Sequence, residues 1–150
     1  MSDLSSLYQE VILDHSKRPR NFHAIDNAEH HANGYNPLCG DKVTIFLHME
    51  GDRIADISFQ GSGCAISTAS ASILTETLKG KTRAEAEALF EAFHNLVTGH
   101  PVNSAATPSL GKLAVFSGVS EFPVRVKCAS LAWHTLRSAL EDRAAVASTE

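Results

Sequence analysis

The sequence lacks the features that mark several large classes of protein. Its apolar runs are far too short to cross a bilayer, and its first residues contain neither the basic segment nor the apolar core of a secretory signal. The formal charge is −4 without a basic stripe, which makes nucleic acid an unexpected partner. P-loop and dinucleotide-binding fingerprints are also missing. We therefore expect a cytoplasmic protein with no nucleic-acid partner and no membrane partner.

Internal repeats, linkers and low-complexity tracts are absent as well, which favours one compact unit. The chain has 150 residues, of which 43% are apolar and 20% are charged. This length supports one core, and this composition argues against wholesale disorder. We predict a single domain over residues 1–150, with an ordered core of about residues 4–142.

Hydrophobic periodicity predicts a helix, then a small sheet, then further helices. Two apolar, β-branched segments, 43–49 and 53–59, are separated by turn residues and predict a hairpin, with 29–35 as a third strand. The fold class is therefore α+β, with a small antiparallel three-stranded sheet packed with helices. We expect the tail from Ala144 to be frayed. Helices are predicted at 4–15, 66–78, 83–97 after a capping box at Thr82 and Glu85, 110–119, and in a last segment that Cys128 opens.

Three cysteines are the most informative residues. An odd count without an export signal indicates a reducing compartment, where cysteines bind metals or react rather than form disulfides. Cys39 falls in a turn, while Cys64 and Cys128 are expected at helix N-termini, where the helix dipole favours the thiolate. Together with the carboxylate of Asp41 they would make a complete tetrahedral zinc set.

Spacing alone leaves two interpretations of these residues open. No local motif such as a paired Cys-X-X-Cys is present, and Cys64 and Cys128 would also serve as small apolar residues of the core. Three glycines favour a site, because glycine lets the backbone approach a ligand closely: Gly40 beside Cys39, and Gly61 and Gly63 before Cys64.

The eight histidines do not predict a second metal site. His30 and His31 fall on a predicted strand and point to opposite faces, so they cannot easily share one ion. The hydroxyl residues between Ser67 and Ser72 are tied to no histidine–acid pair by any motif, so we expect no serine nucleophile. The other histidines are expected at the surface or as caps: His15, His23, His48, His94, His100 and His134.

The cysteine segments resemble those of the IscU/NifU/SufU-type iron–sulfur cluster assembly proteins. The matching segments are 36–41 (Asn-Pro-Leu-Cys-Gly-Asp), 61–67 (Gly-Ser-Gly-Cys-Ala-Ile-Ser) and 125–128 (Arg-Val-Lys-Cys). The likeness runs from about Leu7 to Glu141, and the pattern of three cysteines with one aspartate is highly specific. The resemblance implies an α+β fold with a small antiparallel sheet and the metal site at one end.

In two features this chain is more similar to the SufU branch of the family than to the IscU branch. Members of the SufU branch are zinc-dependent sulfurtransferases. IscU-type scaffolds carry histidine directly before the third cysteine, where this chain has Lys127, and the stretch 91–113 is longer than theirs. Residues 121–125 only half resemble the segment that dedicated chaperones bind on IscU-type scaffolds, which argues against such a partner. Arg125 and Lys127 either lower the pKa of Cys128 and attract an anionic sulfur species, or are solvated bases.

The resemblance implies zinc held by Cys39, Asp41, Cys64 and Cys128. It also implies a sulfur relay: a SufS-type, pyridoxal-phosphate cysteine desulfurase forms a persulfide, the catalytic Cys39 accepts the terminal sulfur, and a downstream iron–sulfur assembly scaffold receives it. A desulfurase histidine would replace Cys39 on the zinc ion and free the thiol. Exchange of one thiolate for a neutral imidazole relieves the repulsion among four anionic ligands.

Two alternatives remain from the sequence. The same ligands would suit a non-enzymatic scaffold that builds a [2Fe–2S] cluster or holds iron, or a structural zinc domain that only binds a partner. Lys127 and the longer middle segment favour sulfur transfer over the scaffold, and the glycines beside the ligands favour either over the structural domain.

Overall fold

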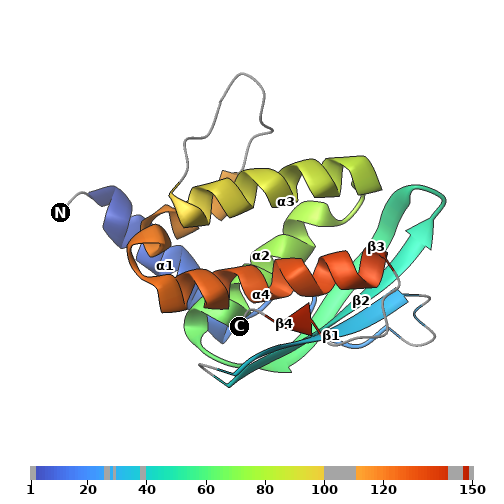
Figure 1. Ribbon diagram of the computed structural model, residues 1–150, viewed down its shortest axis with the longest axis horizontal. Coiled ribbons are helices and arrows are strands. Elements are labelled where there is room, and N and C mark those ends of the chain that lie inside the picture. Colours follow the sequence, from blue (N-terminus) through green and yellow to red (C-terminus); the bar gives the residue numbers. More distant parts are fainter. Residues whose placement is uncertain are drawn as a thin grey trace.

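The computed structural model describes residues 3–25, 28, 30–37, 40–99, 111–141 and 147–148. It combines one sheet with α-helices and a 3-10 helix, in the α+β arrangement that the sequence predicts (Figure 1). The elements, in chain order, are α1 Asp3–Lys17, β1 His30–Asn36, β2 Asp41–Glu50, β3 Arg53–Ser62, α2 Ala65–Leu78, α3 Arg83–Thr98, η1 Gly111–Glu121, α4 Pro123–Leu140 and β4 Ala147–Ser148. Among the described residues, no helix is both long enough and apolar enough to span a membrane.

The predicted antiparallel sheet of three strands is confirmed. The strand order is β3-β2-β1-β4, and β1, β2 and β3 pair antiparallel, with Asn36 opposite Asp41 at one end of the first pair. Alternate residues of β2 are buried because side chains of a strand point to opposite faces. The short β4 pairs parallel to β1 and lies in the tail that was expected to fray. Two residues are too few to show the alternation that identifies a strand in sequence.

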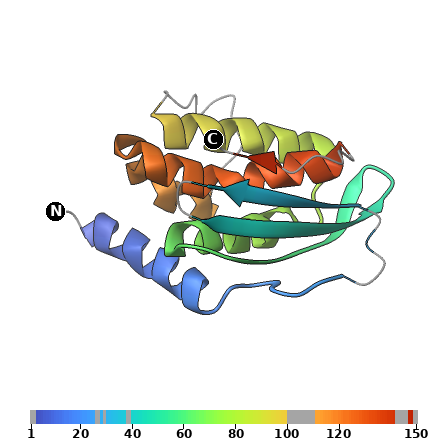
Figure 2. The ribbon, with the colours of Figure 1, turned by 60° about the horizontal axis from the view of Figure 1, so that its bottom comes forward.

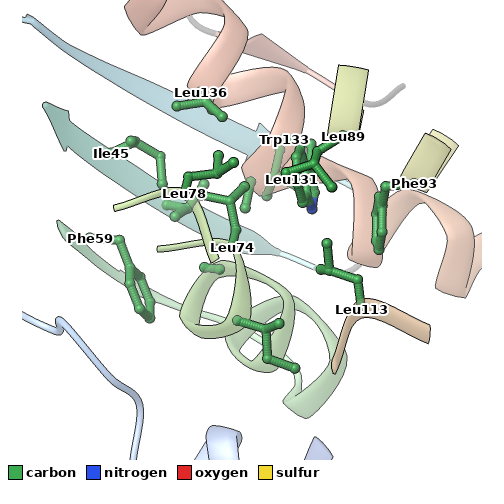
Figure 3. Packing of buried hydrophobic residues seen from close by; sticks show 14 of the residues in the cluster. Ile45, Phe59, Leu74, Leu78, Leu89, Phe93, Leu113, Leu131, Trp133 and Leu136 are labelled. Carbon is green, nitrogen blue, oxygen red and sulfur yellow. The ribbon is translucent and has the colours of Figure 1, made fainter. Parts of the chain in front are cut away.

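Helices α2 and α4 pack on one face of the sheet, and α3 with η1 packs against them from the far side (Figures 1 and 2). Helix α2 is rich in alanine and serine, and nine of its residues are buried, so it lies inside the protein on most of its circumference. In the core, Trp133 of α4 stacks on Phe93 of α3 with ring centroids 5.0 Å apart, and Leu74 and Leu131 lie close by (Figure 3). Burial of each large side chain contributes about 1.5–3 kcal/mol.

The predicted helix boundaries are confirmed except at the last helix. The capping box of α3 is present, since the side chain of Thr82 accepts from the Glu85 N–H and Glu85 accepts from the Thr82 N–H. Helix α4, however, begins at Pro123, and Cys128 therefore lies in its second turn rather than at its start. The physical reason is that proline suits the first helical position, where its fixed φ is already helical and its missing N–H is not needed.

Candidate metal centre

Three of the four predicted ligands converge at one end of the sheet. Asp41 is the first residue of β2, Cys64 is the N-cap of α2, and Cys128 lies in α4. Their ligand atoms all lie within 4.8 Å of one another. The end of β1, the start of α2 and the start of α4 lie at the same end of the molecule, opposite the β2–β3 turn (Figure 2). The fourth predicted ligand, Cys39, lies outside the described residues.

The Asp41 carboxylate is fully buried and held by two donors. The backbone N–H of Cys64 donates to Oδ1 at 2.9 Å, and the amide Nδ2 of Asn36 lies 3.4 Å from Oδ2. A Cβ atom on Gly63 would overlap this carboxylate, so only glycine fits between the carboxylate and the chain that leads to Cys64. Gly63 therefore lets the backbone lie close against the carboxylate of Asp41.

The sulfur of Cys64 caps helix α2. Cys64 has an extended backbone, with φ −72° and ψ 168°, and its Sγ accepts from the Ser67 N–H at 3.4 Å. An unpaired N–H and the positive end of the helix dipole both stabilise a negative sulfur. The expected position of Cys64 at a helix start is therefore confirmed.

Cys128 is stabilised differently from the way the sequence predicts. It is buried, and because it follows the α4 N-terminus by a full turn, the free N–H groups of that terminus do not reach its sulfur. One donor to its sulfur is the side chain of Asn36, with Nδ2 3.7 Å from Sγ. The guanidinium of Arg125, one turn away, instead lies over the ring of Phe122 at 4.4 Å.

This donor set fits a zinc ion. Two thiolate sulfurs and a carboxylate oxygen are ligands that zinc takes in tetrahedral sites, with Zn–S distances of about 2.3 Å and Zn–O of about 2.0–2.2 Å. Ligands at those distances from one centre are about 3.5–4 Å apart, which agrees with atoms clustered within 4.8 Å. The arrangement leaves one tetrahedral position for a further ligand, the one that the sequence predicts for Cys39.

Among the described residues, no histidine joins this group of ligands, and the expectation for His15 is wrong. His15 was expected at the surface or as a cap, but it is 1% exposed, and its Nδ1 lies 2.7 Å from Oγ of Ser72. The signal was available, because His15 follows Val11 by four residues and shares its helix face. His134 is half-buried against Phe90. His100 lies outside the described residues.

Asn36 is part of the sequence motif 36–41, but the sequence alone assigns no role to it. It is buried, and it is the last residue of β1, on the same strand face as Ala32 and Gly34. The alternation of β1 places it on the inner face, but its partners come from β2 and α4. Its contacts depend on how β1 pairs with β2 and how α4 packs on β1. Neither arrangement can be predicted from the spacing of residues in the sequence.

Fold and candidate ligands together define an α+β domain that gathers two cysteine sulfurs and a carboxylate at the end of its sheet. The family model of the NifU-like N terminal domain matches residues 7–129, and the chain belongs to this family.

Relatives extend the likeness over nearly the whole chain. The chain is 40% identical over 144 residues to the iron–sulfur cluster assembly scaffold protein IscU of Streptococcus pyogenes, covering 96% of this chain and 89% of that protein. It is 38% identical over 135 residues to the zinc-dependent sulfurtransferase SufU of Bacillus subtilis, covering 90% of each. Among solved structures, a protein named as an iron–sulfur cluster assembly scaffold protein for the SUF system (FiSufU), from Fervidobacterium islandicum, has a TM-score of 0.82 and 38% identity, covering 90% of this chain and 97% of that one.

Proposed function

We propose that this protein is a zinc-dependent sulfur acceptor in iron–sulfur cluster assembly. The observation that carries the proposal is the convergence of Asp41, Cys64 and Cys128, whose ligand atoms lie within 4.8 Å. The name of the Bacillus subtilis relative supports both zinc and sulfur transfer. Cys39 completes the site in this proposal, and its thiol accepts the sulfur.

Zinc would keep the cysteines ionised and, having no redox chemistry, would not oxidise them. The chain itself orients the ligands: the Cys64 N–H fixes the Asp41 carboxylate, and the first turn of α2 stabilises the Cys64 sulfur. These two residues and Cys128 are built into a strand and two helices, whereas Cys39 belongs to the β1–β2 connection. The anchored residues act as lasting ligands, and Cys39 is the residue that reacts.

The transfer is a thiol–disulfide type exchange. The thiolate of Cys39 attacks the outer sulfur of a persulfide on a cysteine desulfurase, a new S–S bond forms on Cys39, and the S–S bond on the desulfurase breaks. The desulfurase cysteine leaves as a thiolate, so the step needs no outside oxidant or reductant. The proposed partners are a SufS-type, pyridoxal-phosphate desulfurase and, for the next step, a cluster assembly scaffold in the cytoplasm.

A second candidate is a scaffold on which a [2Fe–2S] cluster is assembled with the same ligands. The observation that favours it is the 40% identity to a protein named as a scaffold. Thiolates suit iron–sulfur clusters as well as zinc. Lys127, which stands where IscU-type scaffolds carry histidine, favours sulfur transfer.

The experiment that separates the two has two stages. Elemental analysis of the protein as isolated should give one zinc per chain. With cysteine and a thiol reductant that converts persulfide sulfur to sulfide, a purified cysteine desulfurase should then release sulfide faster when the protein is added. Stoichiometric iron with visible charge-transfer absorption, together with no stimulation of the desulfurase, would instead establish the scaffold.

A further inference from the structure

We propose that Asn36 is a positioning residue of the metal centre, holding Asp41 and Cys128 in the geometry that binds the ion. The inference rests on the metal site of the proposed function but not on sulfur transfer. It assigns a role to a side chain that does not coordinate the metal itself.

One amide group reaches both ligands. Nδ2 of Asn36 lies 3.4 Å from Oδ2 of Asp41 and 3.7 Å from Sγ of Cys128, and the side chain is fully buried. An amide nitrogen carries two hydrogens, so it can donate to both acceptors at once. Asp41 belongs to the sheet and Cys128 to α4, so this side chain links the two layers at the site.

The backbone brings the amide to this position. Asn36 is paired directly with Asp41 across the β1–β2 ladder. On the other side, a Cβ atom on Gly34 would overlap the side chain of Thr135 and crowd Leu131, so glycine at this point lets α4 lie close against β1. Residues 128, 131 and 135 lie on one face of α4, so Cys128 is one helical turn before Leu131. Asn36 is two residues after Gly34 on the same face of β1. The contact of Gly34 with α4 therefore brings Asn36 close to Cys128.

The chemistry of the amide matches the task. A carboxylate and a thiolate a few ångströms apart repel each other before a cation arrives, and an N–H group that faces both reduces that repulsion without adding a charge. Groups that orient metal ligands in this way typically contribute about 10–100-fold in metal affinity. An aspartate of the same shape would remove the donor and add a third negative charge.

The test compares Asn36→Ala and Asn36→Asp with a matched control on the same strand. Asn33 lies on the exposed face of β1, where its Oδ1 accepts from Thr44 Oγ1 at 2.6 Å, and Asn33→Asp keeps that acceptor. Zinc affinity is measured by competition with a chromophoric chelator, and the ligand geometry by the absorption of the Co²⁺-substituted protein. Thermal unfolding of the metal-free protein reports packing separately.

We expect Asn36→Ala to weaken zinc binding about 10–100-fold and to shift the cobalt bands, Asn36→Asp to weaken it further, and Asn33→Asp to match the wild type. If Asn36→Ala does not fold, Asn36→Asp decides, since it preserves the shape. Wild-type affinity and wild-type cobalt bands in a folded Asn36 variant, even with a lower melting temperature, would show a packing role and overturn the proposal. A wild-type protein that binds zinc but accepts no sulfur would refute the proposed function while the comparison of Asn36 variants still stands.

Discussion

The backbone N–H of Cys64 donates to the side chain of Asp41 at 2.9 Å, so one candidate ligand is positioned by the main chain of another. The two residues are 23 positions apart, at the start of β2 and the N-cap of α2. The bond couples the geometry of the metal centre to the junction between sheet and helix. We therefore expect substitution of Asp41 to change both metal binding and folding, and suitable variants separate the two effects.

Asp41→Ala should weaken zinc binding and lower stability, whereas Asp41→Asn should mainly weaken zinc binding. Alanine removes the ligand and leaves the partly buried Cys64 N–H without its acceptor, which costs at most about 1–3 kcal/mol. Asparagine removes the charge but keeps an oxygen at the position of Oδ1. Chelator competition measures the affinity, and urea unfolding of the metal-free protein measures the stability. Equal stability losses in both variants would contradict the role of the Cys64 N–H bond.

Gly63→Ala should reduce zinc affinity without changing any ligand. The added methyl group would overlap the Asp41 carboxylate and displace it from the centre. Gly118→Ala is the matched control, because a Cβ at that position meets no atom within 4 Å. We expect about a tenfold or greater loss of affinity in Gly63→Ala, in the range seen when groups that orient a ligand are disturbed, and no change in Gly118→Ala. Equal affinities in the two variants would show that the carboxylate is free to move.

Cys39→Ser should abolish sulfur transfer while some metal is retained, and Cys64→Ser and Cys128→Ser should lose metal and stability first. Cys64 and Cys128 are fixed by the helices that carry them, whereas Cys39 is in the connection between β1 and β2. After exposure to desulfurase and cysteine, mass spectrometry of each cysteine-containing peptide locates the persulfide. A persulfide found chiefly on Cys64 or Cys128, in a Cys39→Ser variant that still accepts sulfur, would reverse the assignment of roles.

Most of the fold could be predicted from the sequence because its signals are local. The hairpin of β2 and β3, the capping box at Thr82 and the start of α2 after Cys64 each depend on residues within a few positions of one another. Pro123 is also a local signal, because proline suits the first position of a helix, but the prediction opened the last helix at Cys128 instead. This error moved the expected start of α4 by more than a turn.

The centre itself could be predicted only in part. The cysteines and Asp41 were identified as ligands by residue type and motif, and the structure brings Asp41, Cys64 and Cys128 together. The role of Asn36 could not be predicted, because it requires the register of β1 on β2 and the docking of α4 on β1. The burial of His15 could have been predicted from the helix face it shares with Val11, but its partner Ser72 in α2 is distant in sequence.

His15 makes the stability of the protein depend on pH. Burial lowers the pKa of His15, and the nearby positive charges of Arg20 and Lys112 lower it further, with smaller opposing effects from Glu76 and Asp14. Lys112 Nζ lies 3.5 Å from Nε2 of the ring, and Oγ of Ser72 lies 2.7 Å from Nδ1, so a second ring proton would face a cation. The folded protein therefore holds a neutral imidazole under conditions in which the unfolded chain is already protonated.

The sign of the effect follows from the lowered pKa. Above the ordinary histidine pKa of about 6.5 the ring is neutral in both states, and the stability associated with it is fully present. As the pH falls below that value, the unfolded chain takes up the proton first, and this stability is lost until the lower pKa of the folded state is passed. His15→Asn keeps a polar atom near the position of Nδ1 but cannot titrate, so its free energy of unfolding should fall less between pH 7 and pH 5 than that of the wild type. Urea unfolding at each pH measures the free energy of unfolding of both proteins. Contributions from His134 and the metal ligands are the same in wild type and variant, so they cancel in the difference between the two. His31→Asn, on the exposed face of the strand, is the control. Parallel pH profiles for wild type and His15→Asn would show that the buried ring accepts a proton in the folded state as readily as in the unfolded one.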